Sequence, residues 1–423
     1  MPLRASVVNK NNLNPKPKPN PNPKLNPPPP AAQTMKPHIT TLLIATFALA
    51  STAPANAAPD DNPDTSLTVN FAREIGSVPA KRVITIPKVG EFLVLKGDFH
   101  IHTLLSDGVV WPTQRVVEAD GNGLDVIAIT DHIEVRPRLD GRNKRDKNGK
   151  PMNIPIRVES EHHNSSYELA KAEADKRKLL LVHGTEITKF RMPPGHFNAL
   201  FIKDTNKIAA RVDDYRKMFQ EVVAQGGFLV WNHPGWQSPQ KGGIKKGAPS
   251  VFTEEHQEIY KNGWMHGIEA FNGREFYPVV TNWCTQRNLA VFANSDIHNS
   301  EFETYGARNP RRPVTLVLAR EKTLESVREA FFDTRTIGWA ADMIFGQEKW
   351  VRPLFDACVE IKKEDGNLSF TNRSSIPAKI LVGGQTVQLA PLSTAKAAQS
   401  GARTITVENW LVGKNKPLTV PLD

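Results

Sequence analysis

The chain has 423 residues, which is enough for more than one domain and for a large buried core. Its apolar (39%) and charged (23%) fractions are those of a soluble globular protein. The net charge of +10 would suggest a nucleic-acid partner, but residues 1–57 hold six basic and no acidic residues. The remainder has 48 basic against 44 acidic residues, and this near balance argues against nucleic-acid binding.

Residues 1–57 have the layout of a Pro-rich stretch followed by a secretory signal peptide. The stretch NNLNPKPKPNPNPKLNPPPP is of low complexity and cannot form a core. Met35 then precedes an apolar run at 42–50 and small residues that end in ANAA, which predicts cleavage after Ala57. The run is too short for a stable membrane anchor. We expect translation to start at Met35 and the protein to be periplasmic or secreted; a tethering N-terminal helix is the alternative.

Strand-like runs and helical patterns alternate over the next part of the chain. Short apolar runs lie at 91–102, 124–132, 179–187, 196–202, 227–234, 267–273 and 290–298. Apolar residues at helical spacing occupy 167–178, 213–225 and 323–333. This alternation indicates a mostly parallel sheet with both faces covered. We predict an α/β fold with a closed or nearly closed β/α barrel over about residues 66–350, and a doubly wound open sheet is the alternative.

The strand-like runs end in side chains that can bind a metal ion. These are His100, His102, His132, Glu186, His233, Asp296 and His298, whereas His196 opens its run. In a barrel the C-terminal strand ends form the active site, and residues two apart on a strand share a face. Each motif alone has a structural explanation: Asp131 could bond to His132, and NHPG could be a turn. Their repetition at successive strand ends predicts a polynuclear metal site.

The motifs DFHIHTLLSDG, ITDH, GTEIT, GHFNAL, WNHPG and NSDIH, in this order over residues 93–300, resemble the polymerase and histidinol phosphatase (PHP) family. The resemblance implies a distorted (β/α)7 TIM-like barrel with three divalent metal ions at its mouth. It assigns the first metal to His100, His102, Glu186 and Asp296, the second to a bridging Glu186, His196 and His233, and the third to Asp107, His132 and His298. Asp107 stands where some members of the family have His.

The ligand types indicate the chemistry. Imidazoles and carboxylates without thiolates favour Mn, with Zn or Fe as alternatives. Metal ions bridged by a carboxylate lower the pKa of a bound water and polarise a phosphoryl oxygen. The sequence has no G-x-S-x-G and no P-loop motif, so we expect metal-bound hydroxide to attack phosphorus directly. The expected catalytic residues are Glu186, which positions the hydroxide, Asp296 and His298.

Three basic residues are candidates for binding the anionic substrate. Arg136 lies in a basic loop after the His132 motif, and Lys189 and Arg191 lie in KFRMPPGH, between two ligand motifs. The alternative for each is a solvated loop charge. Cys284 and Cys358 lie in no C-x-x-C spacing and receive no chemical role; they form either one disulfide or two separate buried thiols.

The tail, residues 351–423, contains short β-type runs separated by turn signals such as EDGN and GG, which predicts a small β-sandwich domain. A Pro-rich upstream segment with a signal peptide (1–57), a PHP barrel (58–350) and such a domain together resemble secreted PHP phosphodiesterases, including those acting on alkyl and aryl organophosphate diesters. We therefore expect a phosphodiesterase for small phosphate esters, with the β domain packed either on the barrel or on a second subunit of a homo-oligomer. A phosphomonoesterase of the histidinol-phosphatase or nucleotide-phosphatase type is the alternative. A non-catalytic or proofreading PHP module is disfavoured by the complete ligand set.

Overall fold

The computed structural model describes residues 81–135, 162–191, 193–236, 250–305, 312–364 and 366–422. All of them belong to one compact unit, Phe71–Asp423. The predictions for residues 1–57 and for Arg136 therefore concern residues outside the described ranges. No helix within these ranges is long and apolar enough to cross a membrane.

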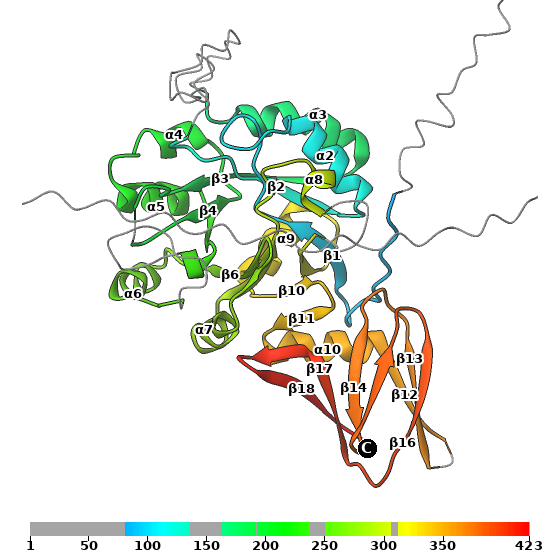
Figure 1. Cartoon of the computed structure of the whole chain (residues 1–423). Helices are drawn as coiled ribbons and strands as arrows, with labels where there is room; N and C mark the ends of the chain where they lie inside the picture. Colours follow the sequence, from blue (N-terminus) through cyan, green and yellow to red (C-terminus); the bar gives the residue numbers. More distant parts are fainter. Residues whose placement is uncertain are drawn as a thin grey trace, which may run out of the picture. The chain divides into compact units, whose positions relative to one another are not determined.

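Each strand-like run between residues 91 and 298 contains a strand, and the three helical patterns form helices, as predicted (Figure 1). The strands are β1 (Leu93–Asp98), β2 (Val126–Ile129), β3 (Leu180–Ile187), β4 (Phe197–Leu200), β5 (Phe228–Trp231), β6 (Gly267–Asn272), β7 (Glu275–Phe276), β8 (Ala290–Asn294), β9 (Val314–Ala319), β10 (Thr336–Ala340), β11 (Met343–Gly346), β12 (Val359–Glu364), β13 (Asn367–Asn372), β14 (Ala378–Val382), β15 (Gln385–Leu389), β16 (Thr394–Ala398), β17 (Thr404–Gly413) and β18 (Lys416–Pro421). The helices are α2 (Pro112–Gly121), α3 (Ser165–Arg177), α4 (Thr205–Ala209), α5 (Tyr215–Ala224), α6 (Glu254–Lys261), α7 (Val279–Arg287), α8 (Glu301–Tyr305), α9 (Leu324–Phe332) and α10 (Glu348–Cys358).

The large sheet is mixed rather than mostly parallel. Its order is β15-β14-β17-β11-β10-β9-β1-β2-β3-β4-β5-β6-β7, with β8 on β6 and β18 on β17. The neighbours β1/β2, β2/β3, β5/β6 and β6/β8 are parallel, but β4 is antiparallel to β3 and β5, and β9 is antiparallel to β1. The expectation of a mostly parallel sheet is wrong here because β3 and β4 are joined by residues 188–196, too few for the crossover helix that a parallel pair requires.

The predicted closed or nearly closed, distorted TIM-like barrel is not confirmed: within the described ranges, no ladder of strand hydrogen bonds joins β8 to β9, although an isolated bridge links Ile101 after β1 to Ile297 after β8. The Val291 and Ala293 amides of β8 donate to the hydroxyls of Thr336 and Thr315, each at 3.0 Å, instead of to strand carbonyls. The fold is therefore a mixed α/β structure with a large open sheet. The sequence pattern could not predict that these threonine hydroxyls accept from the β8 amides, because threonine is common in ordinary strands.

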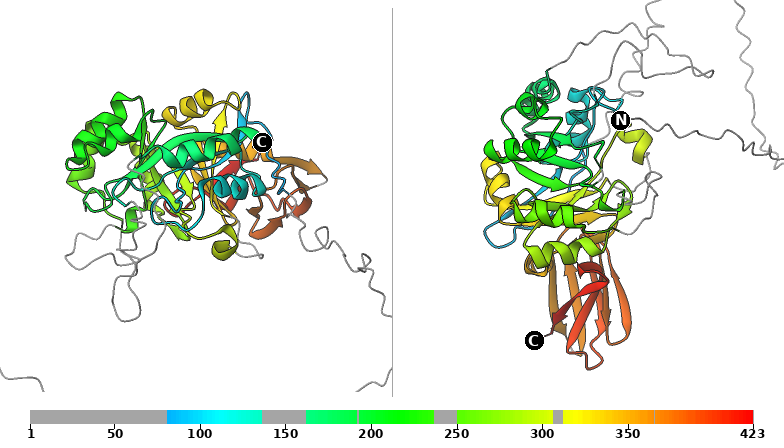
Figure 2. Two further views of the ribbon diagram at one scale, coloured as in Figure 1. Left: turned by 90° about the horizontal axis from the view of Figure 1, so that it is seen from above. Right: turned by 90° about the vertical axis from the view of Figure 1, so that its left-hand side faces the viewer.

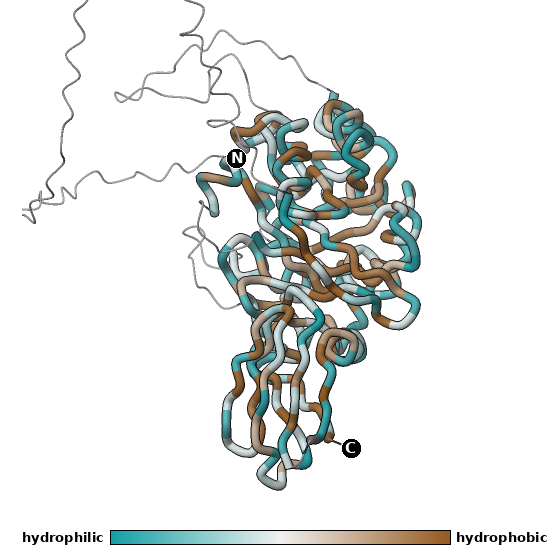
Figure 3. The backbone as a smooth tube through the Cα atoms, turned by 90° about the vertical axis from the view of Figure 1, so that its right-hand side faces the viewer, coloured by the Kyte–Doolittle hydropathy of each residue, from teal (hydrophilic) through white to brown (hydrophobic). Residues whose placement is uncertain are grey.

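Side chains alternate along β1 and the residues after it, and this alternation separates the core from the site. Phe99 packs edge-to-face against Phe292 and Phe331, with ring centroids 6.0 and 4.8 Å apart. Ile101 is also fully buried in the hydrophobic core. His100 and His102 take the opposite face, as the two-residue period requires. In Figure 3 the hydrophobic stretches of backbone follow the strands inside the unit.

The tail forms the predicted β-type strands, which lie in two sheets, and buried residues of both sheets, such as Phe370 and Val407, belong to one hydrophobic core. Strands β12, β13 and β16 make a three-stranded antiparallel sheet. Strands β14, β15, β17 and β18 instead continue the large sheet, because β17 pairs with β11 in parallel, with Trp410 opposite Ile344. Trp410 is buried, and its ring lies 5.5 Å from that of Phe355. Figure 2 shows the strands of the tail, β12 to β18, in orange to red and together at one end of the unit. Cys284 and Cys358 are free, buried thiols.

Candidate metal centre

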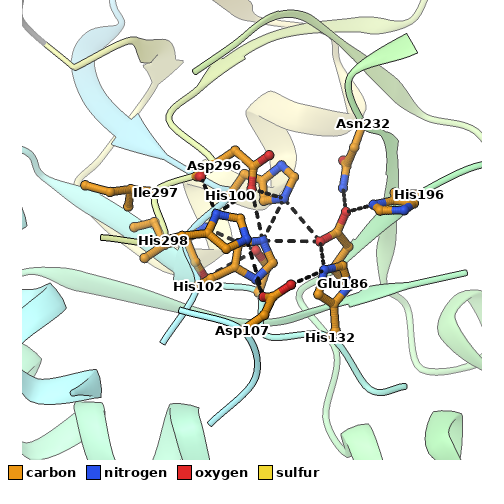
Figure 4. Close-up of polar contacts among 12 residues, drawn as sticks. His100, His102, Asp107, His132, Glu186, His196, Asn232, Asp296, Ile297 and His298 are labelled. Atoms are coloured by element: carbon orange, nitrogen blue, oxygen red, sulfur yellow. Dashed lines mark hydrogen bonds and ion pairs between the residues drawn. The ribbon is translucent and has the colours of Figure 1, made fainter. Parts of the chain in front are cut away.

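The nine side chains predicted to bind metal lie together near the ends of β1, β2, β3, β5 and β8 and the start of β4; Figure 4 labels eight of them, and His233 also contacts Glu186. Six of these residues are buried, whereas Asp107, Asp296 and His298 are partly exposed. Asp107 comes from the loop between β1 and α2. His233 and Asp296 have positive φ angles of 27° and 49°, a backbone strain that is concentrated at functional sites.

One oxygen of Glu186 faces a first group of imidazoles. Its Oε2 lies 3.3 Å from His100 Nε2 and 3.2 Å from both His102 Nε2 and His132 Nε2. The two ring nitrogens of His100 and His102 are themselves 3.1 Å apart. Such close spacing of nitrogen and oxygen atoms is that of ligands around a common cation.

The other oxygen of Glu186 faces a second group. Its Oε1 lies 2.9 Å from His196 Nδ1 and 3.6 Å from His233 Nε2, and it accepts a hydrogen bond of 2.9 Å from Asn232 Nδ2. His196 Nε2 contacts the Lys189 carbonyl at 3.1 Å, and a carbonyl only accepts, so Nε2 carries the proton and Nδ1 keeps its lone pair. Glu186 can therefore share its two oxygens between two cations.

The contacts of the Asp296 carboxylate indicate whether these residues fit a metal ion. Its Oδ1 lies 3.1 Å from both His100 Nε2 and His102 Nε2, yet this buried oxygen has no hydrogen bond of acceptable geometry. His100 Nδ1 lies 2.8 Å from Glu269 Oε1, which can only accept, so the proton sits on Nδ1 and Nε2 presents a lone pair. Facing nitrogen and oxygen lone pairs are stabilised by a proton or a metal cation between them, and a divalent ion fits this set of imidazole and carboxylate atoms.

The residues predicted for a third metal ion are spread more widely around Asp107. Asp107 Oδ1 lies 3.3 Å from His298 Nε2, and Asp107 Oδ2 lies 3.5 Å from His132 Nε2. His298 Nδ1 donates to the Asp296 carbonyl at 2.8 Å, which leaves its Nε2 free to bind. Four sets of ligand atoms in the described ranges lie close enough to hold an ion: His100, Glu186 and His233; His100, His102 and Asp296; His102, His132 and Glu186; and His102, Asp107 and His298.

The carboxylates of the centre stay ionised. Burial by itself would raise the pKa of Glu186, but the neighbouring imidazoles, His132 first, lower it well below its usual range. Burial would likewise raise the pKa of Asp296, but His100 and His102 outweigh this effect and lower it. The same carboxylates raise the pKa of His100 against the effect of burial. The site therefore attracts positive charge.

Glu269 supports the centre from behind, and the sequence analysis missed it. Its Oε1 contacts His100 Nδ1 at 2.8 Å and accepts from Asn294 Nδ2 at 2.9 Å, while its Oε2 accepts from the His233 amide at 2.8 Å and from Asn272 Nδ2 at 2.9 Å. Carboxylates in this position fix the tautomer and orientation of a metal-binding imidazole. A glutamate inside the otherwise apolar run GIEAFNG was the available signal.

Arg115 was missed for another reason: it lies on α2, where an arginine is expected to be exposed. Its guanidinium is buried and donates to the carbonyls of His102 (2.9 Å), Ile297 (3.2 Å), His298 (2.7 Å) and Asn299 (2.7 Å), and to Glu118 (2.9 Å). One side chain thereby ties together the two loops that follow β1 and β8. Asp131 does not pair with His132: it accepts from the Thr103 amide (2.6 Å) and from Ser106 Oγ (2.7 Å).

The candidate substrate-binding residues are placed differently from one another. Lys189 Nζ lies within the centre, 2.5 Å from Asp107 Oδ2 and 2.7 Å from His132 Nε2. Arg191 is exposed and donates to the Asp213 carbonyl at 2.6 Å. Arg136 lies outside the described ranges.

Taken with the mixed sheet, this buried group of imidazoles and carboxylates defines an α/β protein with a candidate polynuclear metal centre. The chain matches no family model and no curated protein. Among solved structures, it is similar to a two-domain protein from Bacteroides vulgatus ATCC 8482 that contains a predicted PHP-like metal-dependent phosphoesterase. The two are 33% identical, the match covers 81% of this chain and 98% of that one, and the TM-score is 0.70.

Two other solved structures are more distant. One is a candidate metal-dependent phosphoesterase from Bifidobacterium adolescentis ATCC 15703 (16% identity, 51% of this chain and 90% of that one, TM-score 0.34). The other is an amidohydrolase from Chromobacterium violaceum (16% identity, 51% and 91%, TM-score 0.33). On the similarity to the B. vulgatus protein, the chain belongs to the PHP-like metal-dependent phosphoesterases.

Proposed function

We propose that the chain is a phosphodiesterase and that its substrates are small phosphate diesters with alkyl or aryl groups. The observation that carries the proposal is the Glu186 carboxylate, which directs one oxygen at each of two imidazole groups. Three divalent ions, Mn by preference and Zn or Fe as alternatives, would supply an activated water and polarise the phosphoryl oxygens.

The side chains of the centre have distinct parts in this proposal. Glu186, held by Asn232, keeps the two imidazole groups at a fixed separation. Asp296 offers a further oxygen to the group formed by His100 and His102. His298 is the most accessible of the candidate ligands, and its Nε2 lies 3.3 Å from Asp107 Oδ1, so the two side chains can act together on the exposed side of the centre.

The charges near the centre favour a diester over a monoester. A diester carries one negative charge and a monoester up to two, so a diester requires less compensation by protein cations. In the described part of the chain, Lys189 is the Lys or Arg residue bonded to side chains of the candidate ligands, whereas Arg115 bonds to their backbone carbonyls, and Lys189 is already paired with Asp107. The Arg191 guanidinium is engaged by the Asp213 carbonyl instead.

Apolar groups next to the ligands favour an alkyl or aryl ester. Phe190, which follows Lys189, is 73% exposed, and Val109, two residues after Asp107, is 62% exposed. Large apolar side chains exposed beside a polar site are typical of binding surfaces. The Val109 amide donates to the His298 carbonyl at 2.9 Å, which keeps this residue at the centre.

A substrate panel tests the proposal. Mn-loaded protein should hydrolyse bis(p-nitrophenyl) phosphate and an alkyl aryl diester faster than p-nitrophenyl phosphate; a large preference for the monoester would support the phosphomonoesterase alternative instead. Glu186→Gln should reduce turnover of the diester at least about a thousandfold, because it removes the shared charge. Glu348→Gln, on an exposed carboxylate that pairs with Lys416, is the matched control and should keep wild-type turnover.

We also propose that the protein acts outside the cytoplasm. The signal-peptide pattern over residues 35–57 supports this proposal. N-terminal sequencing of exported protein should give a chain that begins after Ala57, and an intact segment on the exported protein would contradict it.

A further inference from the structure

Lys189 has a position unlike that of an ordinary surface lysine. It follows Thr188, which has a left-handed φ of 71° in a buried position. The Thr188 amide donates to Glu134 Oε1 at 2.6 Å, and its hydroxyl donates to the Gly195 carbonyl. The Lys189 carbonyl accepts from His196 Nε2 at 3.1 Å. These hydrogen bonds fix the turn in a conformation that points the Lys189 side chain toward Asp107 and His132.

The ammonium group bonds to two of the three residues expected to hold the third metal ion. Lys189 Nζ lies 2.5 Å from Asp107 Oδ2 and 2.7 Å from His132 Nε2, and the lysine side chain is only 23% exposed. The ionic partners of Glu186 and Asp296 in the described structure are, by contrast, imidazoles.

A metal ion and this ammonium group need the same atoms. Lysine has donors only, so its bond to His132 uses the Nε2 lone pair, which is the electron pair that a metal ion would take. The same holds for the Asp107 oxygen. Two cations at such a short distance also repel one another strongly. Both therefore cannot occupy this position together.

We propose that Lys189 is an internal competitor for the third metal position, an inference that rests on the proposed metal-dependent function. With the ammonium group on Asp107 and His132, the chain holds two metal ions around Glu186. A third ion enters only when Lys189 leaves these two ligands, so the third ion is bound more weakly than the first two.

Metal content measured at graded free Mn²⁺ tests this competition. After equilibrium dialysis and elemental analysis, wild-type protein should hold two Mn per chain over a range of free Mn²⁺ in which the third position is not filled. Lys189→Met keeps the side-chain length and removes the charge, so its third Mn should bind at least about tenfold more tightly. Lys189→Arg keeps the charge and should remain close to wild type.

Controls separate this result from a general change. Lys217→Met removes an exposed lysine on α5 and should leave all Mn binding unchanged. Retention of the first two Mn shows that a variant is folded, and Lys189→Gln replaces the methionine variant if that variant does not fold. The competition is refuted if wild-type protein binds three Mn with equal affinity, or if neutralising Lys189 leaves the third Mn unchanged, weaker or undetected. Failure of Mn-loaded wild-type protein to hydrolyse any phosphate ester would refute the proposed function, and leaves the binding result standing.

Discussion

Replacing Arg115 with methionine should destabilise the fold and weaken metal binding together. The buried guanidinium donates to four backbone carbonyls in the two ligand-bearing loops and to Glu118. A hydrogen bond from a charged donor contributes about 1.5–3 kcal/mol, and breaking a buried ion pair costs about 3–5 kcal/mol. Because the carbonyls of His298 and Asn299 are only partly buried and can bind water, we expect a loss of about 3–5 kcal/mol in unfolding free energy rather than the sum over five bonds.

Urea denaturation of metal-free and Mn-saturated protein measures both effects. Metal ions that bind the native state stabilise it by mass action, so looser loops should reduce the stability gained on adding Mn. Arg115→Lys keeps the charge but loses the forked donor geometry, and should cost less, about 2 kcal/mol. Arg352→Met, which removes an exposed pair with Asp356, is the control and should change stability by at most about 0.5 kcal/mol.

A small effect would show that Arg115 does not hold these two loops. If Arg115→Met costs less than about 1 kcal/mol and keeps the full stabilisation by Mn, the loops are held by other contacts. A loss of stability without any loss of Mn binding would make Arg115 important for the fold alone.

Three further predictions concern ligand orientation, pH and stereochemistry. Glu269→Gln should weaken Mn binding about 10- to 100-fold, because a neutral amide supports the proton on His100 Nδ1 less well; equilibrium dialysis measures it, and unchanged affinity would contradict it. Burial lowers the pKa of His183, His256 and His266 to about 4, so the unfolded chain binds more protons below about pH 6.5 and stability should fall from there toward pH 4. A urea midpoint that stays constant over this range would count against the assignment. A diester chiral at phosphorus should be hydrolysed with inversion, as one-step attack by water requires, and retention would indicate a covalent intermediate.

Local patterns in the sequence predicted the strands and the residues at their ends. The alternation Phe99, His100, Ile101, His102 depends only on the two-residue period of a strand, so it could be assigned without knowing the neighbouring strands. The structure brings these histidines together with Glu186 and Asp296.

Features that depend on distant parts of the chain could not be predicted. Which strands become neighbours is decided by loop lengths and by contacts between residues far apart, such as Thr315 with the Ala293 amide. The roles of Arg115 and Lys189 have the same origin. Arg115 drew no attention in the sequence and Lys189 was only a candidate for substrate binding; the carbonyls around the first and the ligands around the second are brought there by distant parts of the chain.

The parallel pairing of β17 with β11 has a consequence for the solubility of the protein. β11 has β10 on one side and β17 on the other, so the tail covers a strand that would otherwise lie at the edge of the large sheet. Ile344 and Phe345 of β11 are both fully buried. A chain ending before β12 would expose an apolar edge with unpaired backbone groups, which is a template for pairing with other molecules. Loss of the tail should therefore appear first as self-association, before any change at the metal centre.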